Sequence, residues 1–143
     1  MLVSTKGRYA LRVMIDLAEH NSGEFIPLKE IADRQEISEK YLESIISTLT
    51  KADFLVGLRG KGGGYRLTRS PEKYTVGSIL KLAEGTLAPV ACLECTPNRC
   101  SRAAQCRTLP MWEKLGKIID DYFEGITLAD LAAEFEGQRD YSI

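Results

Sequence analysis

The stretch ISEKYLESIISTLTKADFLVGLRGKGGGYRL, residues 37–67, decides the fold of this 143-residue chain. In its first half, apolar residues recur at the i, i+3, i+4 and i+7 spacing of a buried helix face: Leu42, Ile45, Ile46 and Leu49. Ser38, just before this run, is a good helix N-cap. The pattern predicts a helix over residues 39–52 with one face in the core.

The opposite face of this predicted helix is polar and framed by lysines. It carries Lys40, Glu43, Ser44, Ser47, Thr48 and Lys51. A shorter helix that opens at Pro27 precedes it, and the tight connection RQEIS joins the two. Two helices arranged in this way fit a helix-turn-helix. On this evidence alone, an ordinary amphipathic surface helix explains the polar face better.

The second half of the stretch makes the helix-turn-helix the better explanation, because it has the pattern of a β-hairpin. A short apolar strand leads to a glycine-rich tip, and a second strand runs through Tyr65 and Leu67. The glycines permit positive φ and a close approach of the backbone to a ligand. The sequence RGKGGGY matches neither the Walker pattern nor G-x-G-x-x-G, which argues against an enzyme phosphate loop.

A helix-turn-helix followed directly by a basic hairpin is a winged helix. The sequence therefore predicts a mainly α fold, a winged helix-turn-helix. In such a fold the second helix enters the major groove of DNA, and wing arginines reach the minor groove or phosphates.

The distribution of charge agrees with this interpretation, although the net charge of the chain is −1. Residues 51–73 carry six basic side chains against two acidic ones, whereas residues 76–143 carry seven basic against ten acidic. A basic patch on an otherwise acidic protein suits one polyanionic surface. A solvated turn rich in lysine and arginine is the simpler explanation, so charge alone decides little.

The amino-acid composition and the N-terminal charges limit which class of protein this chain can be. Hydrophobic residues make up 44% of the chain and charged residues 27%, as in soluble globular proteins. The N-terminal segment is interrupted by Lys6, Arg8, Arg12 and Asp16, so it is neither a signal peptide nor a membrane span. We therefore expect a cytoplasmic protein with no membrane partner. Reducing conditions in that compartment argue against structural disulfides.

Periodicity and caps place the other helices. They are expected over residues 4–20, 75–84 and 110–125, and from about 127 onward. The chain then divides into a winged helix-turn-helix region at 1–85, a cysteine loop at 86–109, and a dimerisation helix with a C-terminal helix at 110–143.

The long helix after Pro110 bears an apolar stripe, formed by Trp112, Leu115, Ile119 and Tyr122. This stripe either packs on its own domain or pairs with its copy in a second subunit. We favour the homodimer, because a lone small winged helix offers few base contacts and a dimer suits a twofold-symmetric DNA site.

Every cysteine lies within CLECTPNRCSRAAQC, residues 92–106. Two disulfides, a zinc site, an iron–sulfur cluster and a thiol switch are the candidate roles. Spacing alone favours zinc, although zinc sites commonly use two separated C-x2-C pairs and only Cys92 with Cys95 has that form. Iron–sulfur clusters also take four cysteines, and neighbouring arginines would offset the thiolate charge.

Three motifs in order resemble one family: STKGRYALRVMIDLA at 4–18, ISEKYLESIISTL at 37–49 and LRGKGGGYRL at 58–67. They resemble the bacterial IscR, NsrR and CymR family of winged-helix transcription regulators (the Rrf2 family), nearest to its IscR-like and CymR-like members. The resemblance covers nearly the whole chain. It implies a homodimer that binds double-stranded operator DNA, such as a repressor, and for many members an iron–sulfur cluster before the dimerisation helix.

The resemblance also implies the cluster ligands. Cys100 and Cys106 match the family spacing, whereas either Cys92 or Cys95 could be the first ligand. Leu109 stands where IscR-like members have a histidine, and Arg8 where NsrR-like members have an acidic residue. The extra cysteine could therefore complete a four-cysteine site. A [2Fe-2S] cluster is favoured, a [4Fe-4S] cluster is possible in principle, and zinc is the alternative.

Expected DNA contacts come from the second helix of the motif and from the wing. The resemblance implicates Tyr41, Glu43, Ser44 and Arg59. With the polar face and the glycine-rich tip, the full set is Lys40, Tyr41, Glu43, Ser44, Thr48, Lys51, Arg59, Lys61, Gly62 and Gly63.

Two regulatory functions follow from the sequence. In the first, a cluster at Cys92–Cys106 modulates operator affinity in response to iron–sulfur status, redox state or nitric oxide. In the second, a CymR-like regulator of sulfur metabolism is controlled by cysteine synthase, which would bind the C-terminal Tyr141, Ser142 and Ile143. A frayed terminus explains this tail more simply. An enzyme is not expected, because His20 stands alone and no nucleophile–base pattern is present.

Overall fold

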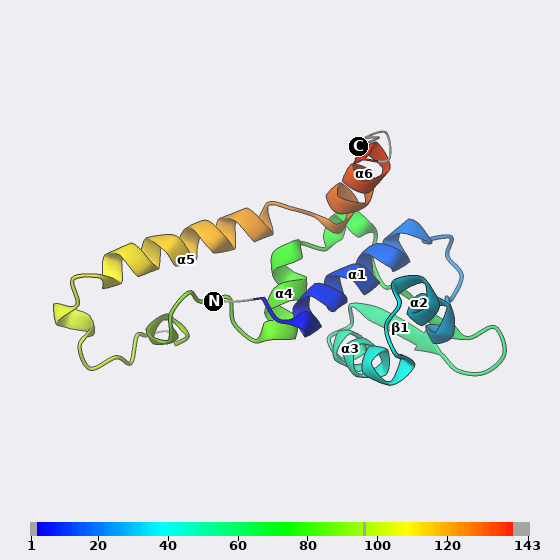
Figure 1. Cartoon of the computed structure of the whole chain (residues 1–143), viewed down its shortest axis with the longest axis horizontal. Coiled ribbons are helices and arrows are strands. Elements are labelled where there is room, and N and C mark those ends of the chain that lie inside the picture. Colours follow the sequence, from blue (N-terminus) through cyan, green and yellow to red (C-terminus); the bar gives the residue numbers. More distant parts are fainter. Residues whose placement is uncertain (1–2, 96, 139–143) are drawn as a thin grey trace.

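A computed structural model describes residues 3–95 and 97–138, with side chains as far as residue 133. Its helices and strands are α1 (Thr5–Glu19), α2 (Leu28–Gln35), α3 (Glu39–Lys51), β1 (Leu55–Leu58), β2 (Gly64–Leu67), α4 (Val76–Glu84), α5 (Leu109–Glu124) and α6 (Leu128–Gln138). Three 3-10 turns join them: η1 (Pro71–Lys73), η2 (Ala91–Leu93) and η3 (Ala103–Gln105). The predicted mainly α, winged-helix architecture is confirmed. Figure 1 shows α1 to α4 gathered with the hairpin, while α5 extends away from them.

Side-chain N-caps start three of the helices. The Ser4 hydroxyl accepts a hydrogen bond from the Gly7 amide, the Ser38 hydroxyl from the Tyr41 amide, and the Thr75 hydroxyl from the Ser78 amide.

The α2–α3 turn contains one feature that the hydrophobic periodicity of the sequence does not reveal. Glu36 ends α2 in the left-handed conformation, with φ 55°, where glycine or asparagine is more usual.

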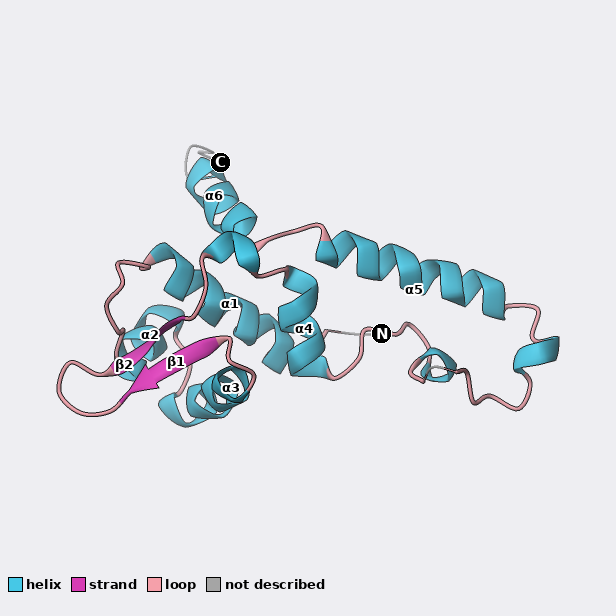
Figure 2. Ribbon diagram, turned by 180° about the vertical axis from the view of Figure 1, so that it is seen from behind, coloured by secondary structure: helices cyan, strands magenta, loops and turns pink. Residues whose placement is uncertain are grey.

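The two strands form the wing, an antiparallel pair in which Leu55 faces Leu67 and Leu58 faces Gly64. A third segment is added to it, because Ile26 and Tyr65 exchange backbone hydrogen bonds of 2.9 and 2.8 Å. Gly64 has φ 145°, and a Cβ there would lie 2.1 Å from the Ile26 carbonyl oxygen. Glycine is therefore required where the wing meets the start of α2 (Figure 2).

The core surrounds α1. The predicted apolar face of α3 is buried, with Leu42, Ile45, Ile46 and Leu49 at most 1% exposed. These side chains pack with Val13 and Met14 of α1, Ile31 of α2 and Ile79 of α4 in one cluster. A second, smaller cluster contains Val76, Leu80 and Leu87, covered by side chains of α5 and α6. Among the described residues, no helix is long and apolar enough to cross a membrane.

Among the side chains that the structure describes, one charged group is buried in this helical core. Asp16 of α1 is 3% exposed, and its carboxylate accepts two hydrogen bonds from Arg34, at 3.0 and 2.8 Å. Gln35 donates a third, at 2.8 Å. The hydrogen bond to Asp16 raises the pKa of the Arg34 guanidinium. Because an unpaired buried carboxylate is costly, these contacts fix α2 against α1.

A buried tyrosine closes the base of the wing. Tyr74 is fully buried, and its hydroxyl donates to the Phe54 carbonyl at 2.8 Å. The same hydroxyl accepts from the Thr68 and Arg69 amides at 3.0 and 3.1 Å. Phe54 precedes β1 and the other two residues follow β2, so one side chain holds both ends of the hairpin together.

We predict that Tyr74→Phe lowers the free energy of unfolding by about 2 kcal/mol, because buried backbone groups lose their hydrogen-bond partner while the ring still fills its space. Denaturant unfolding measures the change. Tyr41→Phe, at a tyrosine that is 36% exposed and packs on Tyr9 through its ring, is the matched control and should leave stability unchanged. Equal stabilities for the two variants would contradict the role given to the Tyr74 hydroxyl.

Candidate nucleic-acid interface and cysteine loop

The polar face of α3 is divided by its contacts with α1. Lys40, Glu43, Ser44, Ser47 and Lys51 are exposed, as expected of a surface that meets a ligand. Tyr41 is also exposed but packs edge to face on Tyr9, with 5.8 Å between ring centroids. Thr48 is partly buried and accepts a 3.3 Å hydrogen bond from the Lys6 ammonium. Both Tyr41 and Thr48 therefore lie on the side of α3 that adjoins the N-terminal half of α1.

The tip of the wing combines exposed cations with glycine backbone. Arg59, Lys61 and Gly62 are exposed. Gly62 has φ 77° with open space around it, whereas a Cβ on Gly63 would lie 2.2 Å from the Leu58 carbonyl oxygen. The predicted wing contacts are thus brought together at one tip. Its conformation needs glycine for a positive φ at one position and for close backbone approach at another.

Two other basic residues of the wing are held by the protein itself. Arg66 donates to the Gly23 carbonyl at 2.7 Å and covers the Phe25 ring at 4.3 Å from its centroid. Arg69 lies over Phe54 and Tyr74, at 5.1 and 4.9 Å from the two centroids. The basic run in the sequence therefore separates into cations that stabilise the wing and cations, such as Arg59 and Lys61, that are exposed and can meet a ligand.

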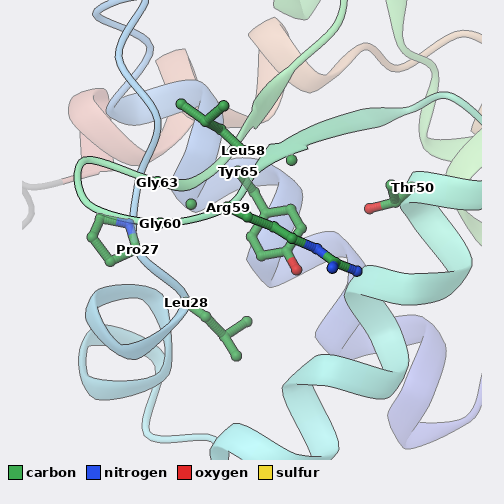
Figure 3. A pocket seen from close by; sticks show the side chains of 10 residues that line it. Pro27, Leu28, Thr50, Leu58, Arg59, Gly60, Gly63 and Tyr65 are labelled. Carbon is green, nitrogen blue, oxygen red and sulfur yellow. The ribbon is translucent and has the colours of Figure 1, made fainter.

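A cleft of about 550 Å³ lies between the wing, α3 and the start of α2. Its lining includes Pro27, Leu28, Thr50, Arg59 and Tyr65. Figure 3 shows Arg59 extending from the wing across Tyr65 toward α3. Sequence reasoning missed Leu28 and Thr50 as possible contacts, because neither belongs to a motif. The available signal was Gly64, the glycine that brings the wing against Ile26.

The cysteine loop joins α4 to α5. Cys92 and Cys106 are partly exposed, Cys95 and Cys100 are exposed, and all four are free thiols. Backbone hydrogen bonds within the loop span three residues, as in Ala103 to Cys100 and Cys106 to Ala103. Among the described residues, no three His, Cys, Asp or Glu side chains are placed to hold a metal ion. The donor set suits an iron–sulfur cluster, but the loop would have to close around it.

Cys106 has the most distinctive surroundings of the four. Its thiol lies 3.4 Å from the Thr108 hydroxyl, just before the start of α5. The hydrogen bond from that hydroxyl, with the backbone amides of Thr108 and Leu109, lowers the pKa of the Cys106 thiol. A group so placed favours the thiolate, the form that binds metals.

Helix α5 has two apolar faces rather than one. Ile119 and Phe123 pack on the smaller core cluster. Met111, Leu115, Ile118 and Tyr122 are 53, 38, 56 and 65% exposed. The predicted stripe is thus split: Leu115 and Tyr122 face outward, Ile119 faces its own domain, and Trp112 is partly buried. Sequence reasoning missed Met111 and Ile118, whose 4-3-4 spacing with Leu115 and Tyr122 was the available signal.

An ion-pair cluster connects α5 to α4. The Lys81 ammonium contacts Asp120 and lies 3.0 Å from Glu124. Hydrogen bonds to Asp120 and then Glu124 raise the pKa of Lys81. Nearby, a Cβ on Gly116 would lie 3.5 Å from Pro89 and 3.7 Å from Leu93. The start of the cysteine loop therefore rests on α5.

The predicted docking residues Tyr141, Ser142 and Ile143 lie outside the described residues.

Comparison with known families and sequences agrees with this geometry. The profile of a family described as "Rrf2: Iron-dependent Transcriptional regulator" matches residues 3–134. A transcriptional regulator IscR of Aliivibrio salmonicida is 34% identical over 139 residues, 97% of this chain and 82% of the relative. Protein rrf2 of Nitratidesulfovibrio vulgaris is 39% identical over 131 residues, which are 92% of this chain and 87% of the relative.

Solved structures are similar along the whole fold. IscR from T. potens is 36% identical with a TM-score of 0.79, covering 100% of this chain and 94% of that one. CymR, described as the global cysteine regulator of B. subtilis, is 34% identical with a TM-score of 0.77. That similarity covers 94% of this chain and 98% of CymR. The homologues are transcriptional regulators rather than enzymes.

Proposed function

The chain belongs to the Rrf2 family of transcriptional regulators, and from that premise we propose that it is a homodimeric regulator whose affinity for operator DNA is set by an iron–sulfur cluster. The observation that carries the proposal is the position of the cysteines. All four lie on the one segment that links α4, in the winged-helix region, to α5. A change in that segment is therefore placed to reach both the DNA-binding surface and the helix proposed for dimerisation.

The DNA-binding surface in this proposal consists of the exposed side of α3 and the tip of the wing. Lys40 and Lys51 are exposed on α3, and Arg59 and Lys61 on the wing. A polar helix face between cations is suited to enter the major groove while the wing contacts the backbone or minor groove. Tyr41 and Thr48, beside α1, would act at the edge of this surface.

The outward face of α5 is the proposed dimer contact. Four large apolar side chains on one face of a solvated helix are unusual unless another surface covers them. Their spacing suits packing against an equivalent helix, and a twofold dimer would present two copies of α3 to a palindromic site.

We predict that Ile118→Lys converts the dimer to a monomer in sedimentation velocity and weakens operator binding, because a lysine would be buried in the contact. Glu113→Lys is the control, since it places a lysine on an exposed position about 140° around the same helix. A variant Ile118→Lys that sediments like the wild type would exclude this face as the dimer contact.

The four cysteines are the proposed cluster ligands. Fe–S clusters are held by thiolates, and the lowered pKa of Cys106 favours that form. The short-range hydrogen bonds of the loop let it rearrange without unfolding the helices on either side. Bound there, a cluster would supply a group sensitive to oxidation, nitric oxide and iron supply. The residues that hold it would convert a change in the cluster into a change in the loop.

We predict that protein purified without oxygen is brown, contains iron and sulfide, and binds operator DNA with an affinity that changes when the cluster is lost. Cys100→Ala and Cys106→Ala should be colourless and should bind DNA as the cluster-free wild type does. Ser101→Ala, in the same loop, should retain colour. Colourless wild-type protein with stoichiometric zinc would replace the cluster by a structural metal.

A second function is favoured by the similarity to CymR, described as a global cysteine regulator. Here the chain would regulate sulfur metabolism under the control of cysteine synthase, which would bind the segment that holds Tyr141, Ser142 and Ile143. The cysteine loop would then hold zinc or act as a thiol switch.

We predict for this alternative that cysteine synthase binds the full chain and that deletion of Ile143 abolishes binding, as measured by calorimetry. Ser142→Ala is the control, since it keeps the aliphatic side chain of Ile143. Binding that survives the deletion, or no binding by the full chain, would contradict it.

A further inference from the structure

A continuous series of side-chain contacts runs from the buried Asp16 carboxylate to the exposed side of α3. Its first members are hydrogen bonds: Asp16 accepts one from the Gln35 side-chain amide at 2.8 Å. The Gln35 side-chain oxygen accepts from Arg12 Nε at 3.1 Å, and the Gln35 backbone carbonyl accepts from a terminal nitrogen of the same guanidinium. Because the guanidinium is planar, two hydrogen bonds to one residue fix the plane in which it lies.

This guanidinium covers an aromatic ring, and that ring supports a second one. Arg12 Cζ lies 4.9 Å from the centroid of Tyr9, which is three residues earlier on α1. The Tyr9 ring meets Tyr41 of α3 edge to face, with 5.8 Å between centroids and 72° between the ring planes. A cation over a ring and an edge-to-face ring pair are both attractive arrangements. Tyr9 is therefore the link between the α1–α2 junction and α3.

Tyr41 is the residue whose orientation this series controls. It lies in the first turn of α3 and is 36% exposed. An exposed aromatic side chain on a helix has more than one allowed χ1 rotamer, and each rotamer places the hydroxyl at a different point of the surface. The contact with Tyr9 favours one of these rotamers. Since that contact uses the ring, it leaves the hydroxyl to meet a ligand.

The stability of the fold does not require the Arg12 guanidinium. Arg12 is exposed. The contact between α1 and α2 is already fixed by Arg34, which donates twice to the buried Asp16 carboxylate. Loss of Arg12 would therefore leave the buried charge paired. What it would remove is the cation over Tyr9 and the restraint on that ring.

We propose that Tyr9 and Arg12 are positioning residues for operator binding, and that they act through Tyr41. Arg12 orients the Tyr9 ring, Tyr9 selects the orientation of the Tyr41 ring, and the Tyr41 hydroxyl contacts the operator. The inference deepens the proposed DNA-binding function and rests on it. A side chain that is oriented before DNA arrives loses less conformational entropy on binding, so the series increases affinity without a contact of its own.

The decisive experiment separates the ring of Tyr41 from its hydroxyl. Tyr41→Phe keeps the ring contact with Tyr9 and removes the group that would meet DNA. Tyr9→Leu removes the supporting ring and keeps an apolar side chain against the core, whereas Tyr9→Phe keeps the ring and is the matched control. Fluorescence anisotropy measures binding to a duplex that the wild-type protein selects from a random library, at a temperature where every variant is folded.

We expect Tyr41→Phe to weaken binding about tenfold, as the loss of a hydrogen bond would. Tyr9→Leu should weaken it about fivefold, the equivalent of an aromatic pair, and Tyr9→Phe should bind as the wild type does. In the Tyr41→Phe background, Tyr9→Leu should have little further effect, because no hydroxyl is left to position. Equal losses from Tyr9→Leu in the two backgrounds would show a merely structural role and overturn the proposal.

Arg12→Lys tests the first step of the series. Lysine keeps the charge but lacks the planar group that bonds to Gln35 and covers Tyr9. We expect about threefold weaker binding, with an unchanged slope of log K against log salt. Arg8→Lys is the matched control, at an exposed arginine that donates to Thr5 of its own helix. If Arg12→Lys and Arg8→Lys bind equally, the role of Arg12 is overturned.

The outcomes distinguish the positioning series from the function as a whole. If the wild type binds no duplex, the proposed function fails. If it binds, and either Tyr41→Phe or Tyr9→Leu binds equally well, the function stands and the positioning role is wrong.

Discussion

The buried carboxylate of Asp16 is the interaction on which the arrangement of this fold depends. At 3% exposure it cannot rely on water, so its hydrogen bonds must come from the protein. Arg34 and Gln35 provide them from the last turn of α2, and Arg12 of α1 in turn contacts Gln35. Apolar contacts alone would allow α2 to pack against α1 in several rotational orientations. A paired carboxylate tolerates far fewer, because a small shift leaves a charge without partners.

The position of α2 then determines both parts of the DNA-binding surface. Through the turn at Glu36, the end of α2 sets where α3 begins. Through Ile26 and Tyr65, the segment before α2 pairs with the wing. The same short helix thus positions α3 at one end and the hairpin at the other. This explains why a cleft with a fixed separation lies between them, rather than two elements that move independently.

The sequence predicts the elements well because each has a local signal. Caps at Ser4, Ser38 and Thr75 mark helix starts, and the 3.6-residue period of α3 marks its buried face. Features that depend on distant contacts are not predictable in this way. Arg66 and Arg59 look equivalent in the sequence, yet Arg66 covers Phe25 and Arg59 extends into solvent. The two faces of α5 likewise differ only because the smaller core cluster covers one of them.

If the cysteine loop controls operator affinity, its effect has to pass through few contacts. Leu93 and Pro89 lie against α5 at Gly116, and Lys81 ties α4 to Asp120 and Glu124. Helix α4 packs in the same core as α1 and α3 through Ile79. A loop that closes around a ligand pulls first on the residues next to Cys92, and hence on their contact with α5. Because ion pairs on a surface are weak, the Lys81 ion pairs are the contacts in this series that break most easily. Because protein interiors are closely packed, the helical core would then transmit a rigid-body shift of α5 rather than absorb it.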